Sequence, residues 1–404
     1  MAEPSLLVLG LNYSPEPIGI GPYTTDLAEG FAQRGWNVRV VAGEPYYPAW
    51  SRFEGAPRGW STRRENDVEV HRCPHYVPQR PTGPRRILHH ASFALSALFP
   101  ALMRSEKRTD VVIVVAPSLL SVPVGWLVAK RRGALLWLHI QDFEVDAAQA
   151  TGLIGSRAGR VAAAIERRLL KSADIISSIG PAMCRRLFAK GIASDRVFEL
   201  RNWANHEGRG TDRDYRKEWN LGERRVLLYS GNIANKQGLD TVIETARRMS
   251  LREDAIFLIC GEGPERERLE GLAAPLDNVR FEDLQPAQDV PALLRLADIH
   301  LLPQRAEAAD LVLPSKLTNM LASGRPVVAT AAPDTGLAAE IAGCGIAVPP
   351  EDPESLAEAL SALLDDPARR QSLGENAARR AADRWSREAI LNGADREIRQ
   401  RTGR

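Results

Sequence analysis

The sequence predicts an α/β protein with two Rossmann-like domains, each built on a doubly wound parallel sheet. The first observation is length, because 404 residues exceed what one hydrophobic core usually organises. The second is that short apolar runs of strand length alternate with stretches of helical periodicity along the chain. The third is a polar, highly charged segment at 202–220, which separates two series of these alternations and is interpreted as a linker.

The first series begins with a strand–helix–strand unit. Residues 5–11 form an apolar run, residues 23–33 have helical periodicity, and residues 38–42 form the next apolar run. Further strands of this half are expected at 111–115, 134–140 and 175–179. Apolar strands separated by helices are typical of a parallel sheet covered on both faces, so we expect a first domain over 1–206.

The second series repeats this order over 207–384. It starts with a strand at 226–229, a glycine-containing loop and a helix at 239–249. Later strands are expected at 255–260, 279–281, 299–302, 327–329 and 346–348. Residues 385–404 are too few for a domain and are expected to form a helix that packs back on the first domain. Ligands of doubly wound sheets bind beyond the carboxyl ends of the strands, so a cleft between the two domains is predicted.

Composition excludes several functional classes. The 53 basic and 51 acidic residues give a formal net charge of +2, which does not favour a nucleic-acid partner. The four cysteines form no C-x-x-C pair and are expected to be reduced, mostly buried thiols of a cytoplasmic protein. The N-terminus lacks a basic region followed by a cleavage pattern, and prolines and charges interrupt the apolar tracts. Neither export nor a membrane-spanning helix is therefore expected.

The loop after the first strand has Gly19 and Gly21 directly before a helix start at Pro22. Unpaired N–H groups at a helix N-terminus favour an anion, although loop glycines also simply form turns. A nicotinamide site is disfavoured, because the third glycine of G-x-G-x-x-G is Thr24 and the loop is long.

Polar residues also follow the strand at 134–140. Strand alternation places His139 and Gln141 on one side, at the strand end that should face the cleft. These side chains could bind a polar ligand such as a sugar or carry protons. The alternative is that His139 is a hydrogen-bonded structural residue.

In the second half, the loop 230–238 again joins a strand to a helix and contains Gly231, Asn232 and Lys236. Glycine permits close approach of the backbone, and an ammonium group beside a helix start suits a diphosphate. A solvated loop lysine is the alternative. Gly261 and Gly263 repeat the arrangement after the next strand and could line the same cleft.

The segment 303–324 passes from an acidic loop into a helix. Glu307 and Asp310 could accept hydrogen bonds from ribose or sugar hydroxyls, and Ser315 and Lys316 at the helix start could bind an anion. Ordinary helix capping in a solvated loop is the alternative. The acidic pair in 212–214 (DRD) lies in the linker and is interpreted as a solvated charge run, so no metal site is expected.

The segment 80–108 combines basic clusters with an apolar set. Such a segment could lie on the surface of an anionic membrane. A core-facing helix with basic ends fits the pattern equally well, and both interpretations remain open.

Several motifs, in order along the chain, carry a resemblance that covers nearly all of it. They are 12–24 (NYSPEPIGIGPYT), 45–48 (PYYP), 139–147 (HIQDFEVDA), 202–203 (NW), 230–232 (SGN) and 314–319 (PSKLTN). This set resembles the colanic-acid-biosynthesis branch of glycosyltransferase family 4. The resemblance implies a GT-B fold, transfer with retention of configuration, no obligatory metal and no cofactor. It also implies a UDP- or GDP-linked sugar donor in the second domain and a glycan acceptor, often lipid-linked, in the first.

Site residues follow from the same resemblance. Gly19 and Gly21 match the glycine loop near the donor diphosphate and sugar, and Lys236 matches the diphosphate lysine. The basic partner of that lysine is replaced by Asn232. Asn319 occupies the position of a ribose-binding glutamate, whose earlier mate is Leu311.

The His-Asp pair of the wider family becomes Gln141-Asp142 in this chain. Lys236, His139 and Asp142 are therefore the catalytic candidates, and Tyr23, Gln141 and Glu144 are the candidates for acceptor binding. Two other functions remain open: a nucleotide-sugar epimerase with the same fold, and a non-catalytic subunit that binds sugar nucleotides in a polysaccharide assembly complex.

Overall fold

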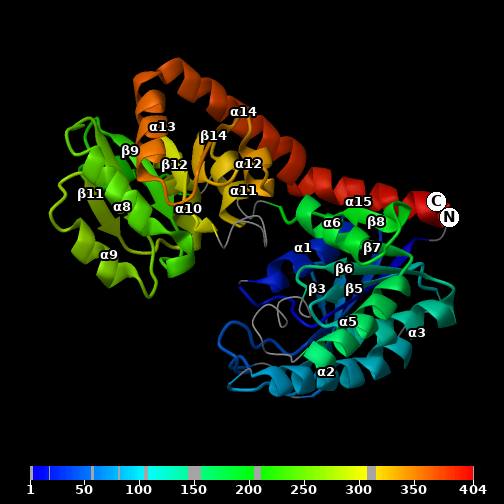
Figure 1. The fold of residues 1–404 in the computed structure, drawn as a ribbon. Coiled ribbons are helices and arrows are strands. Elements are labelled where there is room, and N and C mark those ends of the chain that lie inside the picture. The colour runs from blue at the N-terminus through cyan, green and yellow to red at the C-terminus, as the bar shows by residue number, and fades with distance from the viewer. Residues whose placement is uncertain are drawn as a thin grey trace. The chain divides into compact units, whose positions relative to one another are not determined.

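The computed structural model describes residues 3–17, 19–55, 59–80, 82–103, 108–143, 156–203, 211–306 and 315–403. The chain forms two compact units (Figure 1). Unit 1 comprises Met1–Asn202 and Ile390–Arg404, and unit 2 comprises Trp203–Ala389. The C-terminal segment thus belongs to the unit that contains the N-terminus.

The sheet of unit 1 has eight strands in the order β3-β4-β2-β1-β5-β6-β7-β8, and all neighbours are parallel except the antiparallel pair β3 and β4. The strands are β1 Ser5–Gly10, β2 Asn37–Gly43, β3 Ser61–Glu65, β4 Val68–Cys73, β5 Val111–Ala116, β6 Leu135–Ile140, β7 Ile175–Ser178 and β8 Val197–Glu199. Every residue of β1 and β5 is buried, as the continuous apolar runs predict for a covered parallel sheet.

The helices of unit 1 are α1 Ile20–Ala32, α2 Gly83–Met103, α3 Val122–Arg132, α5 Ser156–Lys171 and α6 Pro181–Ala189, with α15 Arg387–Thr402 at the C-terminal end. Helices α2 and α3 share one hydrophobic core with the sheet (Figure 1). Residues of α15 pack on α1 and on the turn that follows it. A Cβ atom at Gly30 would lie 2.4 Å from Leu391, and the Trp36 indole donates a hydrogen bond to Asp395 at 2.6 Å.

The sheet of unit 2 has six parallel strands in the order β11-β10-β9-β12-β13-β14. The strands are β9 Arg225–Ser230, β10 Ala255–Cys260, β11 Val279–Glu282, β12 Ile299–Leu302, β13 Val327–Thr330 and β14 Gly345–Val348. The helices are α7 Tyr215–Glu218, α8 Leu239–Arg248, α9 Arg266–Ala273, α10 Val290–Leu296, α11 Ser315–Ala322, α12 Gly336–Ile341, α13 Pro353–Asp365 and α14 Pro367–Trp385.

Both faces of this second sheet are covered. One core joins it to α8, α9 and α13, while α7, α10, α11, α12 and α14 contribute to two further cores. Local signals define where helices begin. The Asp352 carboxylate accepts hydrogen bonds from the backbone N–H groups of Glu354 and Ser355, at 3.1 and 3.0 Å, and Pro353 occupies the first turn of α13.

Candidate functional site

The loop after β9 in unit 2 is built around Gly231. Its N–H donates to the Cys260 carbonyl oxygen at 2.9 Å, and its φ of +133° is one that side-chain-bearing residues rarely adopt. A Cβ atom at this position would lie 2.6 Å from Nζ of Lys316. Glycine at 231 therefore leaves space for a lysine side chain that comes from α11, far along the chain.

Gly261 and Gly263, in the loop after β10, have a structural explanation. A Cβ atom would lie 1.9 Å from the carbonyl oxygen of Gly231 in the first case and 2.1 Å from that of Ile233 in the second. The Ile233 N–H also donates to the carbonyl oxygen of Glu262 at 2.8 Å. The two loops thus lie in direct backbone contact, which fixes the shape of the Gly231 loop. A direct contact of Gly261 or Gly263 with a ligand stays a prediction.

Lys236 lies on the next short turn, the 3₁₀ segment η3 (Asn235–Gln237), and its side chain is exposed. The backbone of this turn is anchored, because the N–H of Arg305 donates to the Lys236 carbonyl oxygen at 3.1 Å. The Arg305 guanidinium forms ion pairs with Asp240 and Glu351, at 2.9 and 2.7 Å. Arg305 therefore holds the turn that presents the Lys236 ammonium group.

Lys316 is the second cation beside this loop. Its ammonium group donates to the Tyr229 hydroxyl at 2.7 Å and lies 4.2 Å from the centroid of that ring. Burial and the nearby positive charge of Lys236 lower the pKa of Lys316 to about 8. Among the described residues no carboxylate pairs with Lys316 or with Lys236. A partly buried cation without a counter-ion favours a bound anion.

The remaining predicted donor residues lie nearby or outside the described residues. Asn232 is exposed, and its carbonyl oxygen accepts a hydrogen bond from Tyr229 at 2.5 Å. Asn319, one helical turn after Lys316, has a buried Oδ1 without a hydrogen-bond donor in the described part of the chain. Ser315 begins α11. Glu307 and Asp310 lie outside the described residues.

At the corresponding loop of unit 1, the start of α1 lies against a carboxylate of the protein itself. Gly19 has a φ of +78°, and a Cβ atom there would lie 3.1 Å from the ring of Tyr47. A Cβ atom at Gly21 would lie 3.2 Å from Oε2 of Glu16. Both glycines therefore permit close packing at the helix start.

Glu16 is buried and organises this loop. Its carboxylate accepts hydrogen bonds from the backbone N–H groups of Tyr46 and Tyr47, both at 3.0 Å, and from the Asn12 amide at 2.8 Å. Burial raises the pKa of Glu16. Sequence reasoning missed this residue. The only available signal was an acid set between Pro15 and Pro17 in a loop next to a buried strand.

His139, at the end of β6, is fully enclosed in a network of side chains. The Gln141 amide donates to Nε2 of His139 and to Oδ1 of Asn202, both at 2.9 Å. With Nε2 as acceptor, the neutral ring carries its proton on Nδ1, which lies 2.9 Å from the Ser177 hydroxyl oxygen. Burial lowers the pKa of His139 to about 3.

Both ring nitrogens of His139 already have hydrogen-bond partners, so this network holds the ring in a fixed orientation. Its catalytic role stays a prediction. Asp142 is exposed, Tyr23 is half-buried in the first turn of α1, and Glu144 lies outside the described residues. Of the unit 1 candidates, the described structure brings His139 and Gln141 into direct contact with each other.

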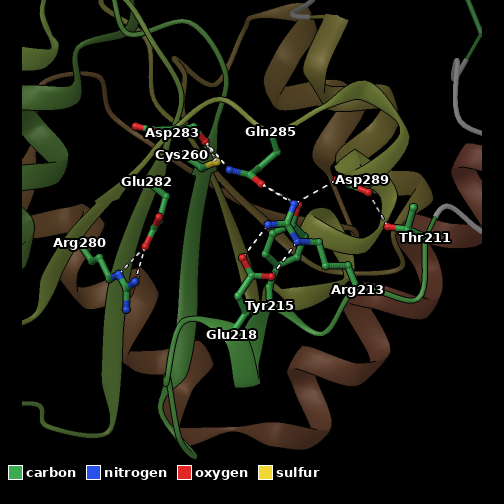
Figure 2. Close-up of polar contacts among 10 residues, drawn as sticks. All are labelled: Thr211, Arg213, Tyr215, Glu218, Cys260, Arg280, Glu282, Asp283, Gln285 and Asp289. Carbon is green, nitrogen blue, oxygen red and sulfur yellow. Dashed lines mark hydrogen bonds and ion pairs between the residues drawn. The ribbon is translucent and has the colours of Figure 1, made fainter.

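The acidic pair in 212–214 is exposed, as the interpretation of a solvated charge run expects. Figure 2 shows Arg213 held by several groups of unit 2. Its guanidinium pairs with Glu218 at 2.6 Å and with Asp289 at 3.1 Å, and donates to Gln285 at 3.1 Å. Asp214 caps α7 through the Lys217 N–H at 3.1 Å. The acidic pair is therefore exposed to solvent, while Arg213 between the two acids ties this part of the chain to Gln285 and Asp289 of unit 2.

Two features are absent from the described residues. None of the helices in that part of the chain combines the length and the apolar character that crossing a membrane requires. No group of three or more His, Cys, Asp and Glu side chains among these residues is arranged to hold a metal ion.

Solved structures share this fold over nearly their whole length. Sucrose-phosphate synthase from Thermosynechococcus elongatus matches with a TM-score of 0.70 and 19% identity, covering 99% of each chain. HepE from Anabaena, solved with UDP, matches with a TM-score of 0.69 and 14% identity, covering 98% of this chain and 100% of its own. The predicted fold class, GT-B with two Rossmann-like domains, is confirmed.

Sequence comparison gives the family. A glycosyl transferase 4-like domain matches residues 19–203, and the domain of glycosyl transferases group 1 matches residues 211–380. The chain is 40% identical over 374 residues to the Escherichia coli (strain K12) protein that carries the name colanic acid biosynthesis glycosyl transferase WcaI, covering 89% of this chain and 92% of the relative. The chain therefore belongs to glycosyltransferase family 4, in the branch that this relative represents.

Proposed function

We propose that this glycosyltransferase moves a sugar from a nucleoside diphosphate sugar to a glycan acceptor during polysaccharide synthesis, with retention of configuration and without a metal or other cofactor. The observation that carries the proposal is the pair Lys236 and Lys316 beside the Gly231 loop, two cations without a described acidic partner. The Escherichia coli relative's name supports polysaccharide synthesis, and the UDP complex of HepE supports a nucleotide donor.

In this proposal the two ammonium groups stabilise the charge that develops on the leaving diphosphate. Preorganised cations act most strongly on charge that appears in the transition state. The leaving phosphate oxygen takes the proton of the acceptor hydroxyl as the new glycosidic bond forms on the same face of the sugar. No metal is then needed to neutralise the diphosphate, because Lys236 and Lys316 supply the positive charge.

Other residues complete the proposed binding sites. Asn319, whose buried Oδ1 has no hydrogen-bond donor among the described residues, receives a ribose hydroxyl, and Glu307 and Asp310 receive further hydroxyl groups. Gln141, Tyr23 and Glu144 bind the acceptor, and Asp142 remains a catalytic candidate. The contribution of Gly19 and Gly21 near the donor sugar stays a prediction.

The Lys236→Ala variant tests the proposal. Loss of a preorganised cation should lower the transfer rate by about 100-fold or more, with little change in thermal stability because the side chain is exposed. Transfer is measured with UDP- and GDP-linked sugars and a lipid-linked glycan acceptor. Lys217→Ala, an exposed lysine on α7, is the control and should behave as wild type. Unchanged transfer by Lys236→Ala would contradict the proposed mechanism.

The same assay separates the two alternative functions. An epimerase would convert the nucleotide sugar in the absence of any acceptor. A non-catalytic subunit would bind the nucleotide but release no nucleoside diphosphate with any acceptor. Nucleoside diphosphate release that depends on acceptor and accompanies glycan extension excludes both alternatives.

We also propose that α2 rests on an anionic membrane surface that presents the lipid-linked acceptor. The inner face of α2 is buried through Phe93, Ala97 and Ala101. Its outer face exposes large apolar side chains, namely Ile87 at 63%, Leu88 at 55%, Leu95 at 75% and Phe99 at 55%. Arg85 and Arg86 are exposed at its start, and residues 83–103 contain no acid.

Trp60 extends this apolar face, because its indole donates to the carbonyl oxygen of Ser96 at 3.1 Å while 56% of the residue is exposed. Aromatic and aliphatic groups bordered by arginines suit the interface of an anionic bilayer. Co-sedimentation with phosphatidylglycerol vesicles tests the proposed contact of α2 with a membrane. The Leu95→Glu/Phe99→Glu variant should lose binding, and Leu251→Glu, at a site 95% exposed in unit 2, should retain it. Equal binding by both variants would contradict this role of α2.

A further inference from the structure

Tyr229 lies between the two elements that present the anion site of unit 2. It is fully buried on β9. Its hydroxyl donates to the Asn232 carbonyl oxygen at 2.5 Å and accepts from Nζ of Lys316 at 2.7 Å. One hydroxyl group therefore joins the Gly231 loop to the first turn of α11.

This arrangement determines where the Lys316 charge lies. The ammonium group is 4.2 Å from the centroid of the Tyr229 ring and fills the space that a side chain at 231 would need. A lysine has a long, flexible side chain, so an isolated Lys316 would sample many positions. The hydroxyl and the ring together hold the charge beside the Gly231 loop.

The loop itself has Lys236 as its only cation, because position 232 is an uncharged asparagine. We propose that Tyr229 is a positioning residue for nucleoside diphosphate binding: its hydroxyl holds the Lys316 ammonium group so that α11 supplies the second cation. This inference rests on the proposed function, since it assumes that the anion is the donor diphosphate.

The protonation states of the pair agree with this role. Burial raises the pKa of Tyr229, so its hydroxyl keeps its proton and accepts from the ammonium group through an oxygen lone pair. The pKa of Lys316 is lowered to about 8 by burial and by Lys236, the charged group that faces it from η3. A bound diphosphate favours the charged lysine and raises this pKa.

Above about pH 8 the free Lys316 side chain is mostly neutral, so binding of a diphosphate must be accompanied by uptake of a proton by this lysine. The terminal phosphate of the ligand, with a pKa of about 6, is already ionised in this range. Affinity of the wild type should fall by up to about tenfold per pH unit between pH 8 and 9.5, whereas a protein without a lysine at 316 should show a much flatter profile.

The test is calorimetric titration of the full chain with UDP and with GDP from pH 7 to 9.5. Tyr229→Phe keeps the ring but removes the hydroxyl, so we expect about fivefold weaker binding at pH 7 and a fall in affinity that begins at lower pH. Lys316→Met should bind more weakly still and lose most of the pH dependence. Lys316→Arg should keep a charge and bind with a flat profile.

Tyr215→Phe is the matched control, because it removes another buried tyrosine hydroxyl of unit 2. That hydroxyl donates to Gln285 at 3.0 Å in the Arg213 network (Figure 2). The control should lose some thermal stability yet match the wild type in affinity and pH profile.

Two results overturn the inference. One is wild-type affinity and pH profile in Tyr229→Phe. If that variant does not fold, the decisive result is a wild-type pH profile in Lys316→Met. Either result, combined with weak binding by Lys236→Ala, rejects the role of Tyr229 and leaves the proposed function standing. Failure of the wild type to bind any nucleoside diphosphate rejects both.

Discussion

The loops that follow β1 and β9 share a strand–glycine–helix construction but differ in the charged side chains beside them. Each joins a buried parallel strand to a helix through glycines at which an added Cβ atom would make close contacts. In unit 2 two lysines converge on the loop, and no described carboxylate pairs with them. In unit 1 the buried carboxylate of Glu16 already lies at the start of α1.

The comparison teaches that the strand–glycine–helix pattern determines backbone shape, while side chains from elsewhere determine which ligand fits. The unit 2 loop carries Lys236 and lies beside Lys316, which suits the anion proposed above. In the unit 1 loop the buried Glu16 carboxylate lies at the start of α1, and the buried Arg72 guanidinium donates to the Ser14 carbonyl oxygen. Placement of the donor in unit 2 and of the acceptor in unit 1 stays a prediction.

The largest effect is expected from a substitution that forces apart the two contacting loops of unit 2. Gly261→Ala would place a methyl group 1.9 Å from the carbonyl oxygen of Gly231, so the two loops must separate. We expect loss of several kcal/mol of stability and of measurable nucleoside diphosphate binding. Gly271→Ala, at a helical position where an added Cβ meets nothing within 4 Å, should instead be neutral or stabilising by up to about 1 kcal/mol. Thermal unfolding and UDP titration measure both, and a stable, binding Gly261→Ala protein would refute the packing argument.

We expect the two units to lose stability at different pH values as the solution becomes acidic. In unit 1 the pKa is lowered to about 4 for His75 and to about 3 for His90 and His139, whereas unit 2 has His300, lowered to about 3. Below pH 6.5 these histidines become protonated in the unfolded chain but stay neutral in the folded protein, so the free energy of unfolding falls as the pH falls. Each group contributes up to about 1.4 kcal/mol per pH unit.

Unit 1 should therefore open at a higher pH than unit 2. Pulse-labelling hydrogen exchange after incubation at pH 7, 6, 5 and 4 would detect the order of opening. Simultaneous loss of protection in β1 and β9 would show that the buried histidines do not determine acid stability.

A smaller effect is expected from Glu16→Gln. The amide oxygen can still accept from Tyr46 and Tyr47, but the new amino group meets the Asn12 amide instead of accepting from it. We expect a loss of about 1 kcal/mol in stability, with unchanged UDP affinity in unit 2. Glu54→Gln, at an exposed position, is the control. Weaker UDP binding by Glu16→Gln would argue against separate roles for the two loops.

The sequence predicted the parallel cores well and their edges poorly. Continuous apolar runs such as β5 and β10 are buried as expected, because a sheet covered on both faces leaves no polar side. The strands β3, β4 and β8 were missed. β3 is a largely exposed edge strand with the sequence STRRE, and β8 is three residues long, so neither has an apolar pattern to recognise.

The candidate site residues also divide into those with a local sequence signal and those without one. The glycine loops, Lys236 and Lys316 were visible because glycine and lysine at a strand–helix junction have local meaning. Tyr229 and Glu16 were not visible, because their roles depend on partners supplied by tertiary contact. His139 was recognisable as a polar residue at a strand end, but its enclosure by Ser177 and Gln141 arises from contacts in the folded chain.

The backbone conformation of Gly231 has a consequence for engineering this loop. An added Cβ at 231 would meet the flexible end of the Lys316 side chain, which can move aside, but the φ of +133° strains any residue that carries a side chain. A library that varies position 231 alone should return glycine almost exclusively. A shorter side chain at 316 would free space without relieving this backbone strain, so randomising both positions together should still return glycine at 231.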